Sequence, residues 1–267
     1  MQVGRPRIMG VVNVTPDSFS DGGRFLDHPA AIAHAHTLVA LGADWVDVGG
    51  ESTRPRAEPV PVDEELRRVV PVVEALAADG VAVSIDTRKA EVARAAVAAG
   101  ARLVNDVSSS LAEVAAEAGA GFVAMHMLGD PRTMQDDPAY DDVVLDVRDY
   151  LVDRADAARA AGVADVWIDP GIGFGKTLDH NLDLLANLDV LVATGYPVLV
   201  ATSRKSMLGT LAARADPGGA VPPPADRLEG SVATAVWALL LGAAMVRAHD
   251  VAATVQAFEA VSYTRET

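Results

Sequence analysis

The stretch Ile8–Gly23, IMGVVNVTPDSFSDGG, decides between two α/β architectures. Its first half is a continuous apolar run, typical of a parallel strand that is covered on both faces, and we expect that strand to end at Val14. An open doubly wound sheet would carry a glycine-rich dinucleotide fingerprint directly after its first strand. The segment NVTPDSFSDGG that follows here is not such a fingerprint. We therefore expect an α/β fold of the closed (β/α)8 TIM-barrel type.

Outward from this stretch, short apolar runs alternate with alanine-rich amphipathic segments along the chain. The expected strands are Ile8–Val14, Trp45–Gly49, Val81–Asp86, Leu103–Val107, Phe122–Met127, Val166–Asp169, Val198–Thr202 and Met245–Ala248. The helical segments between them complete eight strand–helix pairs, the number that a TIM barrel needs. A length of 267 residues without linkers predicts a single domain over residues 1–267.

Composition restricts the class of protein. The formal charge is −15, and such a surface repels nucleic acid and anionic membranes, so neither is expected as a partner. No cysteine is present, which excludes disulfides and thiolate chemistry. The longest apolar stretch, Ala235–Val246, is too short for a membrane span of ~20 residues. Because the N-terminus also lacks an apolar signal region, the sequence predicts a soluble, cytoplasmic protein.

The glycine-rich stretch Val166–Thr177, VWIDPGIGFGKT, has the look of a phosphate-binding loop. The Walker A pattern places a glycine where Pro170 stands, and Gly171 lies too close to the Gly-Lys pair. The dinucleotide pattern also fails, since Gly175 comes one residue early. A nucleotide site is therefore not expected here.

Polar side chains follow every expected strand, at the end where a TIM barrel places its active site. They are Asn13, residues 51–54, Asp86, Asn105, Asp106, His126, Asp169, residues 203–205, Arg247, His249 and Asp250. Any single Asp or Asn among them is more often a helix N-cap than a ligand. Because all eight strands end this way, the pattern indicates a polar cup on an apolar barrel.

One set of these residues suits a flat heterocycle. Asp86, Asn105 and Asp169 can accept hydrogen bonds from amino and ring N–H groups, and Lys205 can donate to ring acceptors. The alternative to ligand binding is that Lys205 belongs to a solvated turn. His126 ends a strand and is left open between a packing and a functional role.

A second set suits a phosphate or pyrophosphate. Arg54, Arg247 and His249 are cationic or can become so, and Asn13 offers an oxygen ligand for Mg²⁺. The alternative to phosphate binding is that Arg247 and His249 form a structural pair at the end of the last strand. The chain has no close histidine cluster, so a zinc site is not expected.

Eight segments resemble, in order, the motifs of the dihydropteroate synthase family: MGVVNVTPDSFSDGG, DVGGESTRP, SIDT, NDVS, MHMLGDPRTMQ, IDPGIGFGK, SRKSMLG and RAHDV. The resemblance runs from Ile8 to about Val251. It implies a TIM-barrel transferase of folate biosynthesis and a sulfonamide target. Such an enzyme condenses 6-hydroxymethyl-7,8-dihydropterin pyrophosphate with p-aminobenzoate and releases pyrophosphate, with Mg²⁺ as cofactor. A homodimer is implied as well.

The resemblance also carries roles onto individual residues. Catalytic roles fall to Asp86, Asp169, Lys205 and Asp21. The pterin would be held by Asp86, Asn105, Met125, Asp169, Phe174 and Lys205. The pyrophosphate would be held by Asn13, Arg54, Arg247 and His249, with Asn13 also a metal ligand. The p-aminobenzoate would be held by Phe19, Thr53, Pro55 and Ser203.

A few positions depart from the family pattern: Arg56, Ser109, Ser110, Ala201 and Ala248. None removes an implied contact, although Ala201 is expected to crowd the pterin pocket slightly. Two other functions stay open. A pterin-dependent methyltransferase domain would need neither a pyrophosphate site nor the SRK segment, and a pterin-binding paralogue would lack turnover altogether.

Overall fold

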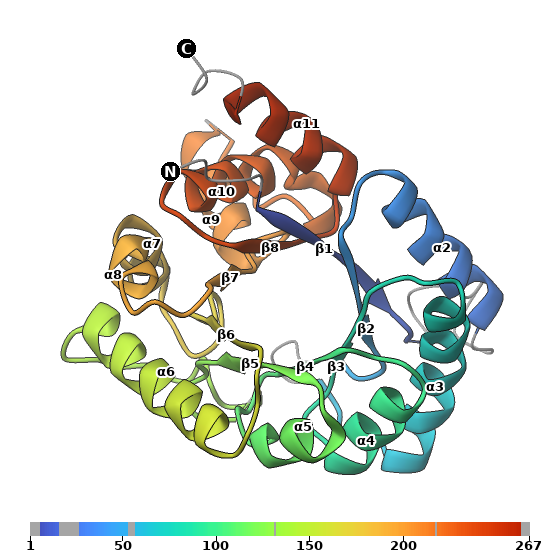
Figure 1. Ribbon diagram of the computed structural model, residues 1–267. Helices are drawn as coiled ribbons and strands as arrows, with labels where there is room; N and C mark the ends of the chain where they lie inside the picture. The colour runs from blue at the N-terminus through green and yellow to red at the C-terminus, as the bar shows by residue number, and fades with distance from the viewer. Residues whose placement is uncertain (1–5, 16–26, 53–56, 131, 217, 263–267) are drawn as a thin grey trace.

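A ring of parallel strands surrounded by helices forms the protein, as the computed structural model shows for residues 6–15, 27–52, 57–130, 132–216 and 218–262 (Figure 1). The strands are β1 (Arg7–Asn13), β2 (Trp45–Gly49), β3 (Val83–Asp86), β4 (Leu103–Asp106), β5 (Gly121–Met125), β6 (Val166–Asp169), β7 (Leu199–Val200) and β8 (Met245–Ala248). The expected strands are thus all present, with small differences at their ends.

The sheet closes on itself. Its order is β6-β5-β4-β3-β2-β1-β8-β7, and every pairing is parallel. A parallel bridge between Ile168 and Val198 joins the two edges, and the Ile168 N–H donates to the Pro197 carbonyl at 3.0 Å. The closed TIM barrel is therefore confirmed, and the open doubly wound sheet is excluded.

The helices cover the outside of the ring (Figure 1). They are α2 (His28–Ala40), α3 (Val62–Ala78), α4 (Ala90–Ala98), α5 (Ala112–Ala118), α6 (Val143–Ala160), α7 (Leu178–Ala186), α8 (Leu188–Val192), α9 (Ser206–Ala215), η1 (Pro224–Asp226), α10 (Leu228–Leu240) and α11 (Val251–Ser262). None of the helices in the described ranges is long and apolar enough to cross a membrane.

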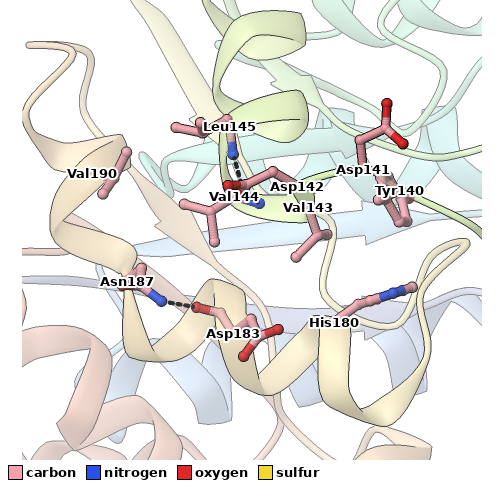
Figure 2. A pocket seen from close by; sticks show the side chains of 10 residues that line it. All are labelled: Tyr140, Asp141, Asp142, Val143, Val144, Leu145, His180, Asp183, Asn187 and Val190. Carbon is pink, nitrogen blue, oxygen red and sulfur yellow. Dashed lines mark hydrogen bonds between the residues drawn. The ribbon is translucent and has the colours of Figure 1, made fainter.

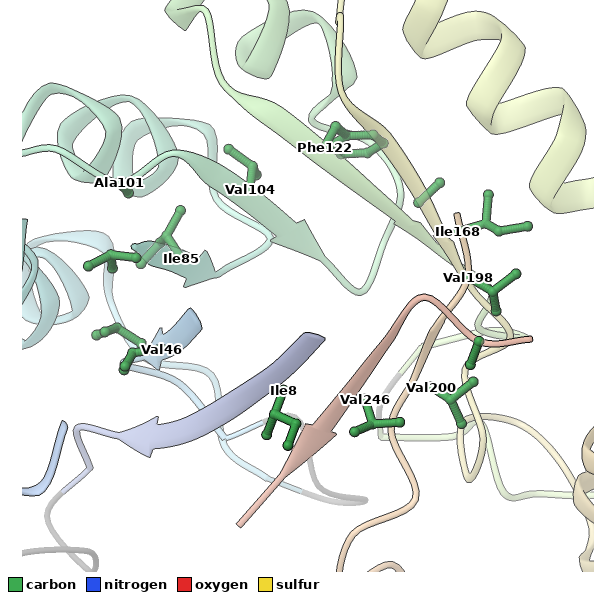
Figure 3. Packing of buried hydrophobic residues seen from close by; sticks show 14 of the residues in the cluster. Ile8, Val46, Ile85, Ala101, Val104, Phe122, Ile168, Val198, Val200 and Val246 are labelled. Carbon is green, nitrogen blue, oxygen red and sulfur yellow. The ribbon is translucent and has the colours of Figure 1, made fainter. Parts of the chain in front are cut away.

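Alternation along the strands builds two apolar layers. Outward side chains such as Ile8, Val46 and Ile168 are fully buried between the sheet and the helices (Figure 3). Inward side chains form a second cluster in the barrel interior: Met9, Leu103, Val123, Trp167, Leu199, Ala201 and Met245. Because side chains fill the barrel, a ligand has room only at its ends.

Strand β7 is shortened the most, because it was expected at Val198–Thr202 but spans only Leu199–Val200. Val198 makes the single bridge to β6 and no longer ladder. At the other end, the Thr202 carbonyl accepts from the Lys205 N–H at 3.1 Å, so the chain is already turning. This early turn brings Ser203 and Lys205 to the carboxyl end of the barrel.

Candidate active site

Ten of the residues assigned from the sequence lie within the described ranges, on strands β1, β3, β4, β5, β6 and β8 or directly after strands β6, β7 and β8. They are Asn13, Asp86, Asn105, Met125, Asp169, Phe174, Ser203, Lys205, Arg247 and His249. The remaining assignments, Phe19, Asp21, Thr53, Arg54 and Pro55, lie outside the described residues, as does Arg56.

An arginine between two acids connects opposite sides of the barrel mouth. Arg247 Nε lies 2.6 Å from Asp47 Oδ2, and Nη2 of the same guanidinium lies 3.0 Å from Asp86 Oδ2. Asn105 Nδ2 donates to the same Asp47 oxygen at 3.1 Å. Residues from β2, β3, β4 and β8 thus form one connected polar group. Asp47, which is fully buried, was not among the residues singled out from the sequence.

The charge state of Asp86 is finely balanced. Burial raises the pKa of Asp86, the nearby Asp47 raises it further, and Arg247 lowers it. Together these influences bring the pKa to about 7. A carboxyl group with a pKa near neutrality in a barrel mouth is a common property of functional sites.

The glycine-rich loop after β6 wraps around Asp169. Asp169 Oδ1 accepts the Gly171 N–H at 2.7 Å. Gly171 has a φ of +63°, and a Cβ there would meet the His126 carbonyl oxygen at 1.8 Å, so only glycine fits. Burial raises the pKa of Asp169, and Lys205 is the strongest opposing influence. The loop therefore presents a buried acid at the barrel mouth.

Lys205 reaches this loop from the end of β7. Its Nζ donates to the Ile172 carbonyl and lies 4.7 Å from the centre of the Phe174 ring. Burial lowers its pKa to about 8, against the attraction of Asp169. The solvated-turn alternative for Lys205 is thus wrong, since the ammonium is enclosed by the loop. Arg204 beside it pairs with Asp250, with Nη2 at 2.6 Å from Oδ1.

Lys176 anchors the same loop from inside, a role that the sequence did not suggest. Only 3% of this residue is exposed. Its Nζ lies 2.8 Å from His126 Nδ1 and donates to the carbonyls of His126, Gly171 and Phe174 at 3.3, 3.2 and 3.0 Å. Burial lowers the pKa of Lys176 to about 7 and that of His126 to about 3. His126, left open from the sequence, is a packing partner of Lys176.

Ser203 and His249 touch. Ser203 Oγ lies 3.0 Å from the imidazole Nδ1 of His249 and accepts a hydrogen bond from the backbone N–H of His249 at 3.1 Å. The sequence assigned them to different ligands, so the two assigned sites adjoin here.

Two strand-end acids serve the protein's own structure. Glu51 Oε2 accepts from Lys89 Nζ at 2.6 Å and from the Val60 N–H at 2.7 Å. Asp106 Oδ2 accepts the N–H groups of Ser110 and Leu111 at 2.6 and 2.9 Å. The expected polar cup is therefore mixed, because these two acids bind Lys89 and backbone N–H groups of the protein itself.

A cavity of about 540 Å³ lies elsewhere, between α6 and the α7–α8 pair (Figure 2). It is lined by Tyr140, Asp141, Asp142, Val143, Val144, Leu145, His180, Asp183, Asn187 and Val190. None of the assigned site residues lines it, and its three acids oppose an anionic ligand.

Comparison with known proteins identifies the family. The family model of pterin binding enzymes matches residues 9–249. The dihydropteroate synthase of Escherichia coli K12 is 45% identical over 99% of this chain and 93% of its own length. That of Mycobacterium leprae is 49% identical over 98% and 94%. The chain belongs to the dihydropteroate synthase family.

Solved dihydropteroate synthases have the same fold. The Xanthomonas albilineans enzyme with 4-aminobenzoic acid superposes with a TM-score of 0.90 at 47% identity, covering 99% of this chain and 94% of that one. The Yersinia pestis enzyme in a sulfonamide drug complex has a TM-score of 0.90 at 45% identity, covering 100% and 96%. The Xanthomonas albilineans enzyme with 7,8-dihydropteroate has a TM-score of 0.87 at 44% identity, covering 100% and 96%.

The described departures from the dihydropteroate synthase pattern lie at buried or hydrogen-bonded positions. Ser109 has a φ of 52°, in the region that glycine favours, and its Oγ donates to the Met125 carbonyl at 2.7 Å. Ser110 Oγ lies 2.9 Å from Ser108 Oγ. Ala201 packs in the interior cluster, and Ala248 is 4% exposed on β8.

Proposed function

We propose that this protein is a dihydropteroate synthase that joins p-aminobenzoate to 6-hydroxymethyl-7,8-dihydropterin pyrophosphate. The C–O bond from the pterin methylene to pyrophosphate breaks, and a C–N bond from that methylene to the aromatic amine forms. The observation that carries the proposal is the group of Asp86, Asn105, Asp169 and Lys205 at one barrel mouth. The chain that holds this group is 45% and 49% identical to the dihydropteroate synthases of Escherichia coli K12 and Mycobacterium leprae.

The pterin end of the proposed site contains Asp86, Asn105, Asp169 and Lys205. Two carboxyl groups and an amide match the amino and ring N–H donors of a pterin, and Lys205 matches its carbonyl. Phe174 lies against Lys205, which supports a flat ligand beside this ring. As pyrophosphate leaves, positive charge develops on the methylene, and fixed carboxylates would stabilise it.

Pyrophosphate binding is assigned to Arg247 and His249, with Arg54 added by resemblance. Asn13, half-buried at the end of β1, would be a ligand of Mg²⁺. Across the described ranges, no group of three His, Asp or Glu side chains could hold a metal unaided. A sparse set of this kind fits Mg²⁺, which binds through few protein groups together with substrate phosphates. When bound, Mg²⁺ would offset the charge of the leaving group.

For p-aminobenzoate, Ser203 is the proposed contact within the described part of the chain, and Phe19, Thr53 and Pro55 are proposed by resemblance. Asp21 is proposed as catalytic on the same ground. The hydrogen bond between Ser203 and His249 supports a p-aminobenzoate site next to the leaving group, as the transfer requires.

The deciding experiment is pyrophosphate release from the pterin pyrophosphate with and without p-aminobenzoate. We expect release that depends on p-aminobenzoate and yields dihydropteroate. Pterin binding without release would favour the non-catalytic paralogue. Methyl transfer to a corrinoid without pyrophosphate release would favour the methyltransferase domain.

A single domain and a homodimer in the cytoplasm complete the proposal. Trp237 and Leu240 expose apolar surface on α10, at 49% and 41%, which supports burial against a second copy. The cysteine-free sequence suits a reducing compartment. Light scattering would test the dimer, and a monomer at micromolar concentration would reject it.

A further inference from the structure

Asp47 is an acid in the middle of a buried strand. Its neighbours Val46 and Val48 pack outward with the helices, so alternation turns Asp47 into the barrel. The side chain is fully buried, at 0% exposure. Burying a carboxylate is unfavourable unless it is paired, and such a residue in a barrel interior calls for a functional reason.

Its hydrogen bonds go to one residue from each end of the proposed site, Arg247 from the pyrophosphate end and Asn105 from the pterin end. Asp47 Oδ2 accepts from Arg247 Nε at 2.6 Å and from Asn105 Nδ2 at 3.1 Å. These partners stand on β8 and β4, neither of which adjoins β2 in the sheet, so both contacts cross the barrel interior. Asp47 therefore fixes two side chains from opposite sides of the mouth.

The register places Asp47 one layer below Asp86. Asp47 is the Cα partner of Ser84, and Asp86 lies two residues further along β3, opposite Gly49. The Arg247 guanidinium spans the two layers, because its Nη2 reaches Asp86 Oδ2 at 3.0 Å.

The other oxygen of Asp47 is not compensated. Within the described ranges, Asp47 Oδ1 and the neighbouring Ser84 Oγ are buried and have no hydrogen-bond partner. Arg247 shares its charge between two acids, so the negative charge of Asp47 is only partly neutralised.

We propose that Asp47 is a positioning residue for the pterin end: it holds Arg247 and Asn105 in place, and its charge acts on Asp86 across the shared guanidinium. This inference rests on the proposed function for the identity of the ligand, but its test does not require turnover.

The charges around Asp86 come from several elements. Asp47 on β2, Glu65 on α3 and Asp106 on β4 oppose its ionisation, whereas Arg247 on β8 favours it. Lys205 after β7 also acts on Asp86. Burial is the largest cause of the raised pKa, which is about 7, and Asp47 is the next largest. Removing the charge of Asp47 without moving Arg247 should therefore lower the pKa of Asp86.

The direct test is a ¹³C NMR titration of aspartate carboxyl groups in the ligand-free protein, with Asp86→Asn used to assign the Asp86 signal. Asp47→Asn removes the charge but keeps an oxygen that can accept from Arg247. We expect it to lower the midpoint of Asp86 by roughly one pH unit or more. Ser84→Ala is the matched control, because it changes the neighbouring buried oxygen and no charge, and its midpoint should stay at the wild-type value. An unchanged midpoint in Asp47→Asn would overturn the proposal.

Asp47→Ala tests the positioning role. It removes the acceptor of Arg247 and Asn105 as well as the charge, so 6-hydroxymethyl-7,8-dihydropterin should bind more weakly to it than to Asp47→Asn at pH 8.5, where Asp86 is ionised in both variants. Equal affinities would overturn the positioning role. If neither variant is recovered folded, Asp47 is a folding residue and the proposal fails. A normal shift of the Asp86 midpoint without any pterin binding would instead reject the proposed function alone.

Discussion

Arg247 at the end of β8 and Asp86 at the end of β3 are joined across the barrel mouth, with Nη2 of the arginine 3.0 Å from Oδ2 of the acid. Two strands separate β3 from β8 in the sheet order, so the pair spans the barrel interior. From the sequence, Asp86 was assigned to the pterin and Arg247 to the pyrophosphate alone. The ion pair means that the two ends of the proposed site share one cation.

Arg247→Ala is expected to weaken the binding of both ligands. Pyrophosphate loses a cation, and Asp86 loses the group that favours its ionised form, so more of it is protonated at pH 7. A hydrogen bond to a charged group is worth about 1.5–3 kcal/mol, which corresponds to roughly 10–150-fold in affinity. Calorimetric titration with pyrophosphate plus Mg²⁺, and separately with 6-hydroxymethyl-7,8-dihydropterin, measures both effects. A loss for pyrophosphate alone would restore the division made from the sequence.

Asp86→Asn is expected to lower kcat by ~10²–10³, the usual effect of removing one fixed group that stabilises a transition-state charge. The amide keeps the shape of the side chain and removes its charge. Asp141→Asn is a suitable control, because this exposed acid lies outside the proposed site. Wild-type turnover by Asp86→Asn would remove Asp86 from the mechanism.

The pH profile of kcat/KM should be bell-shaped. Asp86, with a pKa of about 7, must be ionised to accept from the pterin, so activity rises through that value. Lys205, with a pKa of about 8, must be protonated to donate, so activity falls above it. The two limbs belong to a coupled group of charges. Lys205→Arg should move the alkaline limb beyond pH 10, and a limb that stays near 8 would exclude Lys205 as its source.

Strand positions were well predicted where an apolar run has sharp ends. The strands Trp45–Gly49, Val166–Asp169 and Met245–Ala248 were expected and found with the same bounds. The run Val198–Thr202 has no such end, because its last residues already form a turn. A hydrophobic pattern in the sequence indicates that residues are buried. It does not distinguish a buried turn from a buried strand, because both give the same apolar run.

Two residues of the candidate site, Asp47 and Lys176, could not be recognised from the sequence, for different physical reasons. Asp47 lies in the middle of a strand, whereas the polar pattern that indicates a TIM-barrel site lies at the strand ends. An acid at an inward position between two valines was the signal that could have revealed it. Lys176 was noticed only as part of a failed phosphate motif, and its contacts with His126 depend on the meeting of two loops 50 residues apart, which no local pattern reports.

Lys176→Met is expected to destabilise the protein by about 2 kcal/mol, because the buried carbonyls of His126, Gly171 and Phe174 lose a hydrogen-bond donor. It should also flatten the pH dependence of stability. In the folded protein, burial lowers the pKa of Lys176 from 10.5 to about 7. Between these values the unfolded chain binds more protons, so the contribution of Lys176 to stability rises with pH. Urea unfolding at pH 7 and pH 9 would measure the free energy of unfolding of both proteins. An equal change in this free energy between the two pH values in wild type and variant would contradict the buried position of Lys176.

The final prediction concerns coupling between p-aminobenzoate and pyrophosphate, and it rests on the contact between Ser203 and His249. Ser203 Oγ lies 3.0 Å from His249 Nδ1, and the same hydroxyl oxygen accepts a hydrogen bond from the backbone N–H of His249 at 3.1 Å. Ser203 is the proposed p-aminobenzoate contact and His249 the proposed pyrophosphate contact. A ligand that fixes one of these residues therefore fixes the other.

We expect p-aminobenzoate to bind more tightly once pyrophosphate and Mg²⁺ are present. Site-to-site coupling of this kind is typically worth about 1–3 kcal/mol, or roughly 5–150-fold in affinity. Titration of p-aminobenzoate into the protein with and without pyrophosphate and Mg²⁺ gives the coupling directly. Ser203→Ala should reduce it, because the link to His249 is lost, while pyrophosphate affinity changes little. By reciprocity, p-aminobenzoate must strengthen pyrophosphate binding by the same factor. Equal affinity of p-aminobenzoate for the empty protein and for the pyrophosphate complex would show that the two sites are independent.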